Sequence, residues 1–143
     1  MAGPASRLAA GVRDALSAEA ALAARIPGFV ARPAQQRLAM AIADTFEHRD
    51  VLLAEAGTGT GKTFAYLVPA LLGGGKVIVS TGTKTLQDQL FNRDLPTVRA
   101  ALKVPVSVAL LKGRANYVCH YHLARNLADG RFTTPEDAGH LRA

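Results

Sequence analysis

Residues 51–72, VLLAEAGTGTGKTFAYLVPALL, constrain this chain more than any other stretch. The apolar run at 51–54 predicts a short buried strand, and residues 64–72 have the pattern of a helix. Between them, residues 56–63 read AGTGTGKT, and the order strand, loop, helix identifies this segment as a phosphate-binding loop. The alternative, a glycine-rich turn with a chance lysine, is disfavoured by the flanking strand and helix.

The loop carries the residue types that bind a nucleoside triphosphate. Gly57, Gly59 and Gly61 permit backbone conformations that side chains forbid, so consecutive N–H groups can surround one anion. Lys62 supplies an ammonium for the β- and γ-phosphates, and the Thr63 hydroxyl is expected to complete the coordination of Mg²⁺. We therefore predict binding of MgATP or a close relative, with Lys62 and Thr63 as the catalytic candidates. The loop residues predicted to bind ATP are Ala56, Gly57, Thr58, Gly59, Thr60, Gly61, Lys62 and Thr63.

The helix expected at residues 33–48 brings two further residues toward the nucleotide. Pro33 suits the first position of a helix, and Arg32 and Gln35 lie at its start. A glutamine amide offers the donor and the acceptor that the adenine edge requires, although Gln35 alone is also typical of a solvated helix residue. The side chains expected on the buried face of this helix are Leu38, Ala41, Ile42 and Phe46.

A second strand is expected at residues 76–80, followed by a helix at 84–91, and a third strand at 105–111. Strand, crossover helix and strand imply a right-handed parallel unit and an α/β fold, with a new helix beginning after the Asp94-Leu95-Pro96 break. Thr81, Thr83 and Lys84 fall at the carboxyl end of the second strand, where parallel sheets bind ligands such as phosphate. A helix N-cap at either threonine is the alternative explanation.

Composition limits the class of protein. With 143 residues, 49% hydrophobic and 20% charged, the chain has the size of one soluble domain. Residues 1–26 predict an alanine-rich helix without an apolar run long enough for a signal core or a membrane span. Residues 76–125 contain eight basic and two acidic side chains, which favours nucleic acid as a partner, although a solvated surface explains the same charge.

The end of the chain has few chemical features. Cys119 is the single cysteine, which excludes an internal disulfide framework and fits a cytoplasmic protein. It opens an expected helix reaching residue 128, and a lone cysteine is usually a small buried residue. His120 and His122 do not share a helix face, so a zinc site is not expected. Residues 133–137 have the form of a capped helix start.

Four stretches together resemble the DinG/YoaA/XPD group of superfamily-two iron–sulfur DNA helicases, most of all its YoaA members. They cover most of residues 27–119 in the order of the family. The four stretches are FVARPAQQRLAMA, VLLAEAGTGTGKTFAYLVPAL, KVIVSTGTKTLQDQLFNRDLP and VALLKGRANYVC.

The resemblance implies a RecA-like ATP-binding lobe, with a parallel sheet flanked by helices, from a helicase that moves 5′ to 3′ on single-stranded or forked DNA. It implies that Gln35 reads adenine beside Arg32, and that Thr81, Thr83 and Lys84 contact the DNA backbone. Cys119 corresponds to the first of four cysteines that ligate a [4Fe–4S] cluster. Replication or repair proteins are the implied class of partner, without an identifiable member.

The chain departs from the family in three respects. It has no Asp-Glu-Ala-His motif, no further cysteine and no second RecA-like lobe. We therefore expect an N-terminal helix at 1–26, the first part of the ATP-binding domain at 27–118, and the start of an iron–sulfur insertion at 119–143. On this interpretation the chain belongs to a longer helicase, and it neither hydrolyses ATP nor unwinds DNA alone. The alternative is a stand-alone P-loop protein, either a regulatory module or a small-molecule kinase.

Overall fold

The structure, a computed structural model, describes residues 6–17, 21–130 and 139. The chain divides into two compact units, Met1–Val108 and Ala109–Ala143. The first unit contains α1 (Arg7–Ala15), α2 (Ala21–Arg25), α3 (Pro33–His48), α4 (Lys62–Leu72), α5 (Lys84–Gln89), the π-helical turn η1 (Leu90–Asp94) and α6 (Leu95–Leu102). The second contains the 3₁₀ turn η2 (Arg114–Asn116) and α7 (His120–Asp129).

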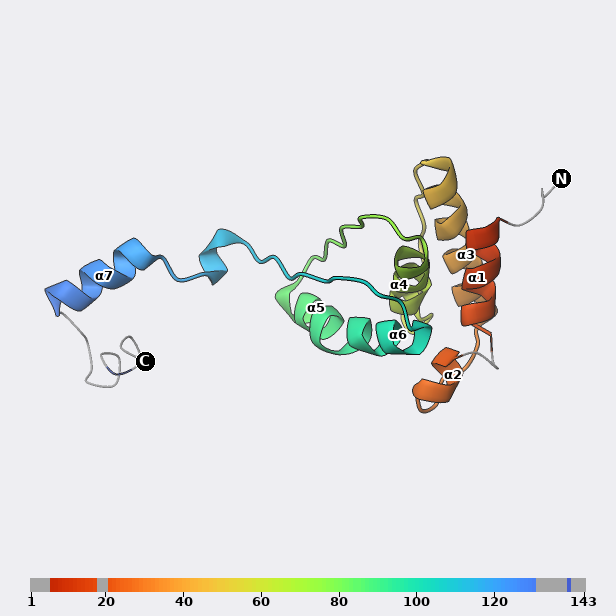
Figure 1. Cartoon of the computed structure of the whole chain (residues 1–143), viewed down its shortest axis with the longest axis horizontal. Coiled ribbons are helices and arrows are strands. Elements are labelled where there is room, and N and C mark those ends of the chain that lie inside the picture. The colour runs from red at the N-terminus through yellow and green to blue at the C-terminus, as the bar shows by residue number, and fades with distance from the viewer. Residues whose placement is uncertain (1–5, 18–20, 131–138, 140–143) are drawn as a thin grey trace. The chain divides into compact units, whose positions relative to one another are not determined.

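The core of the first unit lies between helices. Helices α1, α3 and α4 pack side by side, and α6 packs against α2 and α4 (Figure 1). Small residues on the facing surfaces allow the helix axes to approach closely. The buried hydrophobic side chains are Ala9, Val12, Leu16, Leu22, Ala39, Ala43, Ala65, Leu67, Val68, Leu90, Val98 and Ala101.

The expected single helix at residues 1–26 is wrong in its described part. Helix α1 ends at Ala15, and α2 begins at Ala21. Leu16 and Leu22 are both fully buried. Six residues apart, they would point about 120° away from each other on one straight helix. The break between α1 and α2 therefore lets both leucines reach the same core.

The prediction of a helix beginning at Pro33 and reaching residue 48 is confirmed by α3, which has proline in its first turn. Its predicted buried face is correct only in part: Leu38 packs against the core and Ala41 and Ile42 are half-buried, whereas the fully buried positions are Gln35, Ala39 and Ala43. Phe46 is 41% exposed. Ala39 and Ala43 are the apolar residues of α3 that the core encloses completely.

The expected parallel sheet is not formed among the residues that the structure describes, which contain no β-strand. Residues 51–57, 76–80 and 104–110 instead run as extended chain (Figure 1). Exposure still alternates as in a strand: Val51 and Leu53 are 91% and 99% exposed, against 40% for Leu52. A strand requires a hydrogen-bonding neighbour, and no described segment pairs with these three.

The predicted break after Asp94 is also wrong. Helices α5 and α6 continue into each other through η1, so residues 84–102 form one uninterrupted helical run. Within it, the Leu95 N–H donates to the Leu90 carbonyl five residues earlier, the hydrogen bond of a π-turn. Pro96, which has no N–H to donate, follows directly after this π-turn, so the irregular turn lies where the proline interrupts the regular hydrogen-bond pattern.

In the second unit, α7 begins at His120, after the extended N-cap residue Cys119. The Tyr117 hydroxyl accepts a 3.0 Å hydrogen bond from the Lys112 N–H across η2. Cys119 is the N-cap residue of α7, and it is exposed rather than buried. The expected helix start at 133–137 lies outside the described residues, and the expected domain boundary after residue 118 stays a prediction. None of the described helices is long and apolar enough to cross a membrane.

Candidate nucleotide-binding site

The glycine-rich loop joins the first extended segment to α4. Gly59 and Gly61 have φ values of +74° and +79°, in the left-handed region that side chains disfavour. Gly57 does not have a positive φ, so two of the three glycines are needed for their backbone conformation. The Thr60 hydroxyl donates to the Gly57 carbonyl over 2.9 Å and stabilises the turn.

Gly61 is the N-cap of α4, which places the loop at the positive end of an 11-residue helix. The first N–H groups of a helix have no carbonyl partner inside it, so they are available to an anion. Loop and helix start together provide the backbone geometry of a phosphate site.

Lys62 is folded back onto its own loop. Its Nζ donates to the Ala56 and Gly57 carbonyls, each over 2.7 Å, although the side chain is exposed. The ammonium therefore occupies the mouth of the loop. A triphosphate has to offer its oxygens in exchange for these two carbonyl contacts.

The start of α3 braces the same loop. The Gln35 side chain is only 3% exposed, and its Nε2 donates to the Gly61 carbonyl over 2.9 Å. The Arg32 guanidinium donates to the Gly59 carbonyl. Both residues therefore lie against the loop. The buried Gln35 Oε1 has no partner in the structure, and a contact to adenine stays a prediction.

Tyr66 lies three residues after Thr63, one helical turn further along α4. Burial raises the pKa of Tyr66, a hydrogen bond with the Thr63 side chain lowers it, and the negative charge of Asp94 raises it again, with a net increase. The phenol is therefore neutral at physiological pH. Sequence reasoning missed Tyr66, although its three-residue spacing from Thr63 on one helix was a usable signal.

A pocket of about 560 Å³ lies beside the loop, between α3, α4, the start of α5 and the first extended segment. Lys62 and Thr63 form its polar end, and the rest is mainly apolar. The Thr63 hydroxyl is the kind of oxygen ligand that Mg²⁺ prefers, so this end of the pocket fits the ion. The lining residues are Leu38, Ile42, Thr45, Leu52, Ala54, Lys62, Thr63, Tyr66 and Leu86.

The predicted DNA-contacting residues lie at the start of α5. The Thr83 hydroxyl accepts a 3.2 Å hydrogen bond from the Leu86 N–H, so Thr83 is the N-cap. The Thr81 hydroxyl donates to the Thr83 carbonyl over 3.1 Å, and the Lys84 side chain is exposed. Leu86 lines the same pocket as Lys62, so the structure brings this block close to the loop.

Cys119 lies in the second unit. The described residues contain no group of three or more side chains that could hold a metal ion. One exposed thiol supplies a quarter of the ligands of a [4Fe–4S] cluster, so the residues present do not by themselves fit the cluster.

Comparison of the sequence with known protein families tests the resemblance to helicases. Residues 32–141 match the DEAD/DEAH box helicase family, which covers the loop, its two bracing residues and the start of α5. The chain belongs to the DEAD/DEAH box helicase family. This finding confirms the helicase resemblance seen in the four motif stretches.

Several relatives within the DEAD/DEAH box helicases are similar over most of the chain. The chain is 52% identical to the ATP-dependent DNA helicase YoaA of Escherichia coli K12 over 117 residues, or 82% of the chain and 18% of that relative. It is 50% identical to YoaA of Haemophilus influenzae over 119 residues, or 83% and 19%. It is 46% identical to the ATP-dependent helicase DinG of Mycobacterium tuberculosis H37Rv over 107 residues, or 69% and 16%.

The chain thus spans less than a fifth of the length of these helicases. No solved structure matches it significantly.

Proposed function

We propose that this chain is the first part of the ATP-binding lobe of an ATP-dependent DNA helicase, and that it binds MgATP at residues 56–63. The observation that carries the proposal is the formed loop itself. Two left-handed glycines, Gly59 and Gly61, bring the backbone to the positive end of α4, with Lys62 at the mouth. The family match and the names of the relatives support the same activity.

Each loop residue has a role in this proposal. The Lys62 ammonium leaves the Ala56 and Gly57 carbonyls and neutralises the β- and γ-phosphates, while the N–H groups at the start of α4 hold the phosphate oxygens. The Thr63 hydroxyl holds Mg²⁺, which supplies charge stabilisation for phosphoryl transfer. Gln35 and Arg32 keep the loop in place. Recognition of the adenine edge by Gln35 beside Arg32 is also part of the proposal.

Single-stranded or forked DNA is the proposed polymer substrate, with movement from 5′ to 3′. Thr81, Thr83 and Lys84 contact its phosphates, because hydroxyls, a cation and a helix start gather at the beginning of α5. The excess of basic residues at 76–125 favours the same partner. The proposed location is the cytoplasm.

The RecA-like parallel sheet and the iron–sulfur cluster belong to the complete lobe in this proposal. The three extended segments supply strands when neighbours are present, and their alternating exposure supports that role. Cys119 would be one cluster ligand, and three further thiolates have to come from outside these 143 residues.

The proposal is tested by calorimetric titration of the chain with MgATP. We expect saturable binding that Lys62→Ala abolishes, because the substitution removes the cation aimed at the phosphates. We expect the melting temperature to change little, since Lys62 is exposed and water can replace its hydrogen bonds to the two loop carbonyls. Lys76→Ala, at another exposed lysine, is the control and leaves affinity unchanged. Equal MgATP affinity in the Lys62→Ala variant and the unaltered chain would refute the role of the loop.

A further inference from the structure

Gln36 is a half-buried residue whose amide joins two helices. It lies in the first turn of α3, and its Nε2 donates to the Leu16 carbonyl over 3.0 Å. Leu16 is the C-cap residue of α1 and is fully buried. The last carbonyls of a helix lack a partner within it, so the Gln36 amide satisfies an acceptor that is shielded from water. The bond therefore fixes the end of α1 to the beginning of α3.

Helix α1 is held on α3 at its other end as well. The Leu8 N–H donates to Glu47 Oε1 over 3.3 Å, near the end of α3. The two helices therefore run side by side in opposite directions (Figure 1). Ala9 and Val12, between the two bonds, are at most 1% exposed, and α1 also packs against α4. Helix α1 is thus bonded to the helix that braces the phosphate loop and packed on the helix that follows the loop.

The first turn of α3 depends on such contacts because it has no side-chain cap. Its N-cap residue, Arg32, makes no capping hydrogen bond. Helix ends without a capping side chain are less stable, and they fray. In α3, adjacent side chains reach in two directions instead: Gln35 bonds the Gly61 carbonyl of the loop, and Gln36 bonds α1. Because the two glutamines share one turn, a change in that turn at Gln36 also displaces Gln35.

The Gln35 amide bonds the loop at the point where α4 begins. The Gly61 carbonyl accepts its Nε2 over 2.9 Å and the Ala65 N–H over 3.2 Å, the latter in the first turn of α4. The N–H groups of that turn are those proposed to hold phosphate oxygens. The position of the amide therefore influences how the start of α4 is presented to an anion.

We propose that Gln36 is a positioning residue for the phosphate loop, and that α1 contributes to nucleotide affinity through it. The inference rests on the proposed function. The Gln36 bond to α1 holds the first turn of α3, so that the Gln35 amide stays on the Gly61 carbonyl. Without this bond the turn frays, and the loop adopts shapes that bind a triphosphate less well. Helix α1 precedes residues 32–141, so this support comes from outside the part of the chain that matches the helicase family.

The test is calorimetric titration of the whole chain with MgATP and with magnesium tripolyphosphate. Tripolyphosphate has no base, so its affinity reports on the loop and not on recognition of adenine. We expect Gln36→Ala to weaken both ligands by the same factor of about five, the size of effect that one hydrogen bond supports. A loss confined to MgATP would overturn the inference, because it would place the effect at the base.

A double-variant cycle with Gln35→Ala separates positioning from a general structural role. If Gln36 acts through Gln35, adding Gln36→Ala to a Gln35→Ala variant causes no further loss of tripolyphosphate affinity. Independent roles of the two glutamines give the same loss in both backgrounds, and that result would contradict the inference.

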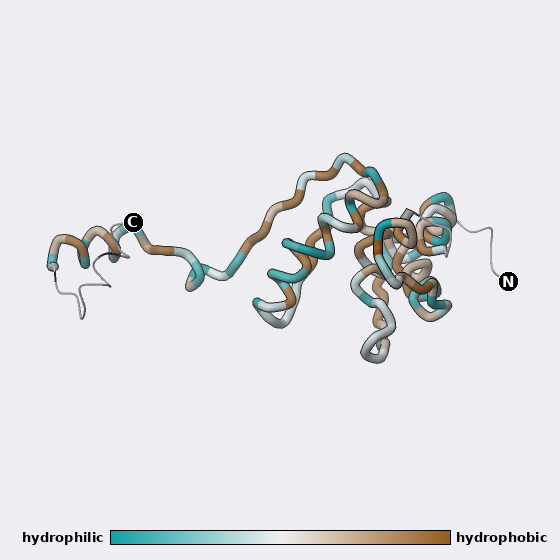
Figure 2. Tube along the Cα trace, turned by 90° about the horizontal axis from the view of Figure 1, so that it is seen from below, coloured by the Kyte–Doolittle hydropathy of each residue, from teal (hydrophilic) through white to brown (hydrophobic). Residues whose placement is uncertain are grey.

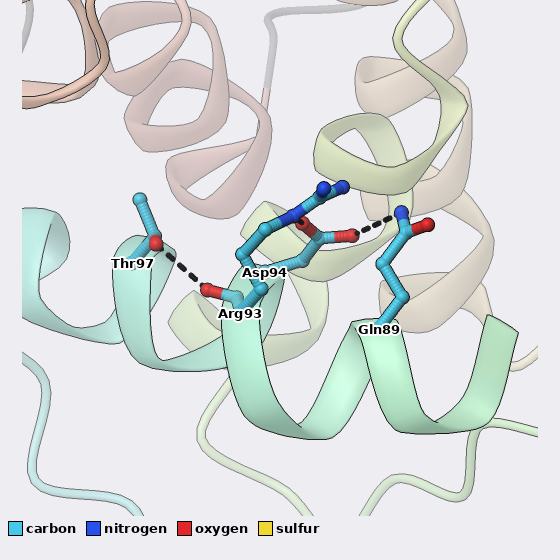
Figure 3. Close-up of polar contacts among 4 residues, drawn as sticks. All are labelled: Gln89, Arg93, Asp94 and Thr97. Carbon is cyan, nitrogen blue, oxygen red and sulfur yellow. Dashed lines mark hydrogen bonds and ion pairs between the residues drawn. The ribbon is translucent and has the colours of Figure 1, made fainter. Parts of the chain in front are cut away.

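Gln89→Ala is the matched control. Gln89 is also half-buried, and its Nε2 donates over 3.0 Å to Oδ2 of Asp94, which is 5% exposed (Figure 3). The substitution removes the same atoms and the same kind of bond, but both partners belong to the helical run of residues 84–102. We expect a similar decrease in melting temperature for the two variants, with unchanged ligand affinities for Gln89→Ala.

An unchanged tripolyphosphate affinity in Gln36→Ala, or an equal loss in Gln89→Ala, refutes the positioning role and leaves the proposed function intact. If Gln36→Ala does not fold, Gln36→Met decides, because it keeps the length of the side chain and lacks the donor. An unaltered chain that binds neither ligand refutes the proposed function and the inference together.

Discussion

Three side chains hold the phosphate loop through its backbone carbonyls. Lys62 bonds the Ala56 and Gly57 carbonyls, Arg32 bonds that of Gly59, and Gln35 bonds that of Gly61. These donors stabilise the shape of the loop at four of its carbonyls. In the proposed complex, nucleotide exchanges only the Lys62 contacts, while the two braces from the start of α3 remain.

Gly61 is the residue on which this arrangement depends most. Its φ is +79°, and a Cβ at this position would collide with Gln35 Nε2. We expect Gly61→Ala to lower the free energy of unfolding by about 1–3 kcal/mol, because it combines left-handed strain with displacement of the buried amide. Urea denaturation measures the loss.

Gly57→Ala is the matched control, since its φ is not positive and a Cβ there would meet nothing within 4 Å. Adding Gly61→Ala to a Gln35→Ala variant should cost less than adding it to the unaltered chain, because only the backbone strain remains once the amide is gone. Equal stability of the Gly57→Ala and Gly61→Ala variants would contradict this account.

At the scale of elements, the helical run of residues 84–102 links the two chemical parts of the first unit. Its N-terminal end carries the block predicted to contact DNA, and its π-turn buries Asp94 next to the phosphate-loop helix. Thr83 has an observed role as N-cap and a proposed role as DNA contact. The two roles can be separated because they respond differently to an acidic substitution.

Thr83→Ala removes the cap and should cost about 1 kcal/mol of stability. Thr83→Asp keeps a capping oxygen and preserves stability, but its negative charge should weaken binding of single-stranded DNA. Urea denaturation and fluorescence anisotropy measure the two effects.

Ser6→Ala provides the control, because Ser6 caps α1 through the Ala9 N–H over 3.0 Å and lies outside the proposed DNA contact. It should lower stability to a similar degree without changing DNA affinity. If Thr83→Asp binds DNA as well as the unaltered chain, Thr83 is a helix cap and nothing more.

At the scale of the whole molecule, the extended segments expose hydrophobic side chains, which strands of a packed sheet bury. Figure 2 shows hydrophobic residues along extended parts of the chain as well as in the helices. Leu53 is 99% exposed and Ile78 is 90% exposed, whereas Leu67 in the helical core is 1% exposed. Exposed apolar strand-like segments of this kind favour association between molecules.

We therefore expect the chain to self-associate as its concentration rises, and the double substitution Leu53→Lys and Ile78→Lys to reduce that association. The melting temperature should not fall, because neither side chain is packed. Light scattering coupled to size-exclusion chromatography gives the molar mass. Leu67→Lys, which places a charge in the core, should unfold the chain, and persistent association of the double variant would contradict the role of the exposed segments.

The sequence alone determined the features that depend on neighbouring residues. The phosphate loop, α3 from Pro33 and α4 after Gly61 could be predicted, because glycine conformations, proline placement and hydrogen bonds four residues apart act locally. The charge excess and the four motif stretches indicated a helicase before any geometry was available. The family match confirmed that indication.

Tertiary structure decided what depends on distant partners. The extended segments have strand-like alternation, yet no sheet forms among the described residues, because a strand needs a paired neighbour that periodicity cannot supply. Packing between helices buried Gln35 against Gly61. It also buried the face of α3 that carries the small residues Ala39 and Ala43. The π-turn that contains Asp94 could not be predicted from the sequence either. The burial of the Asp94 carboxylate depends on the packing of α6 against α4, which local patterns do not show.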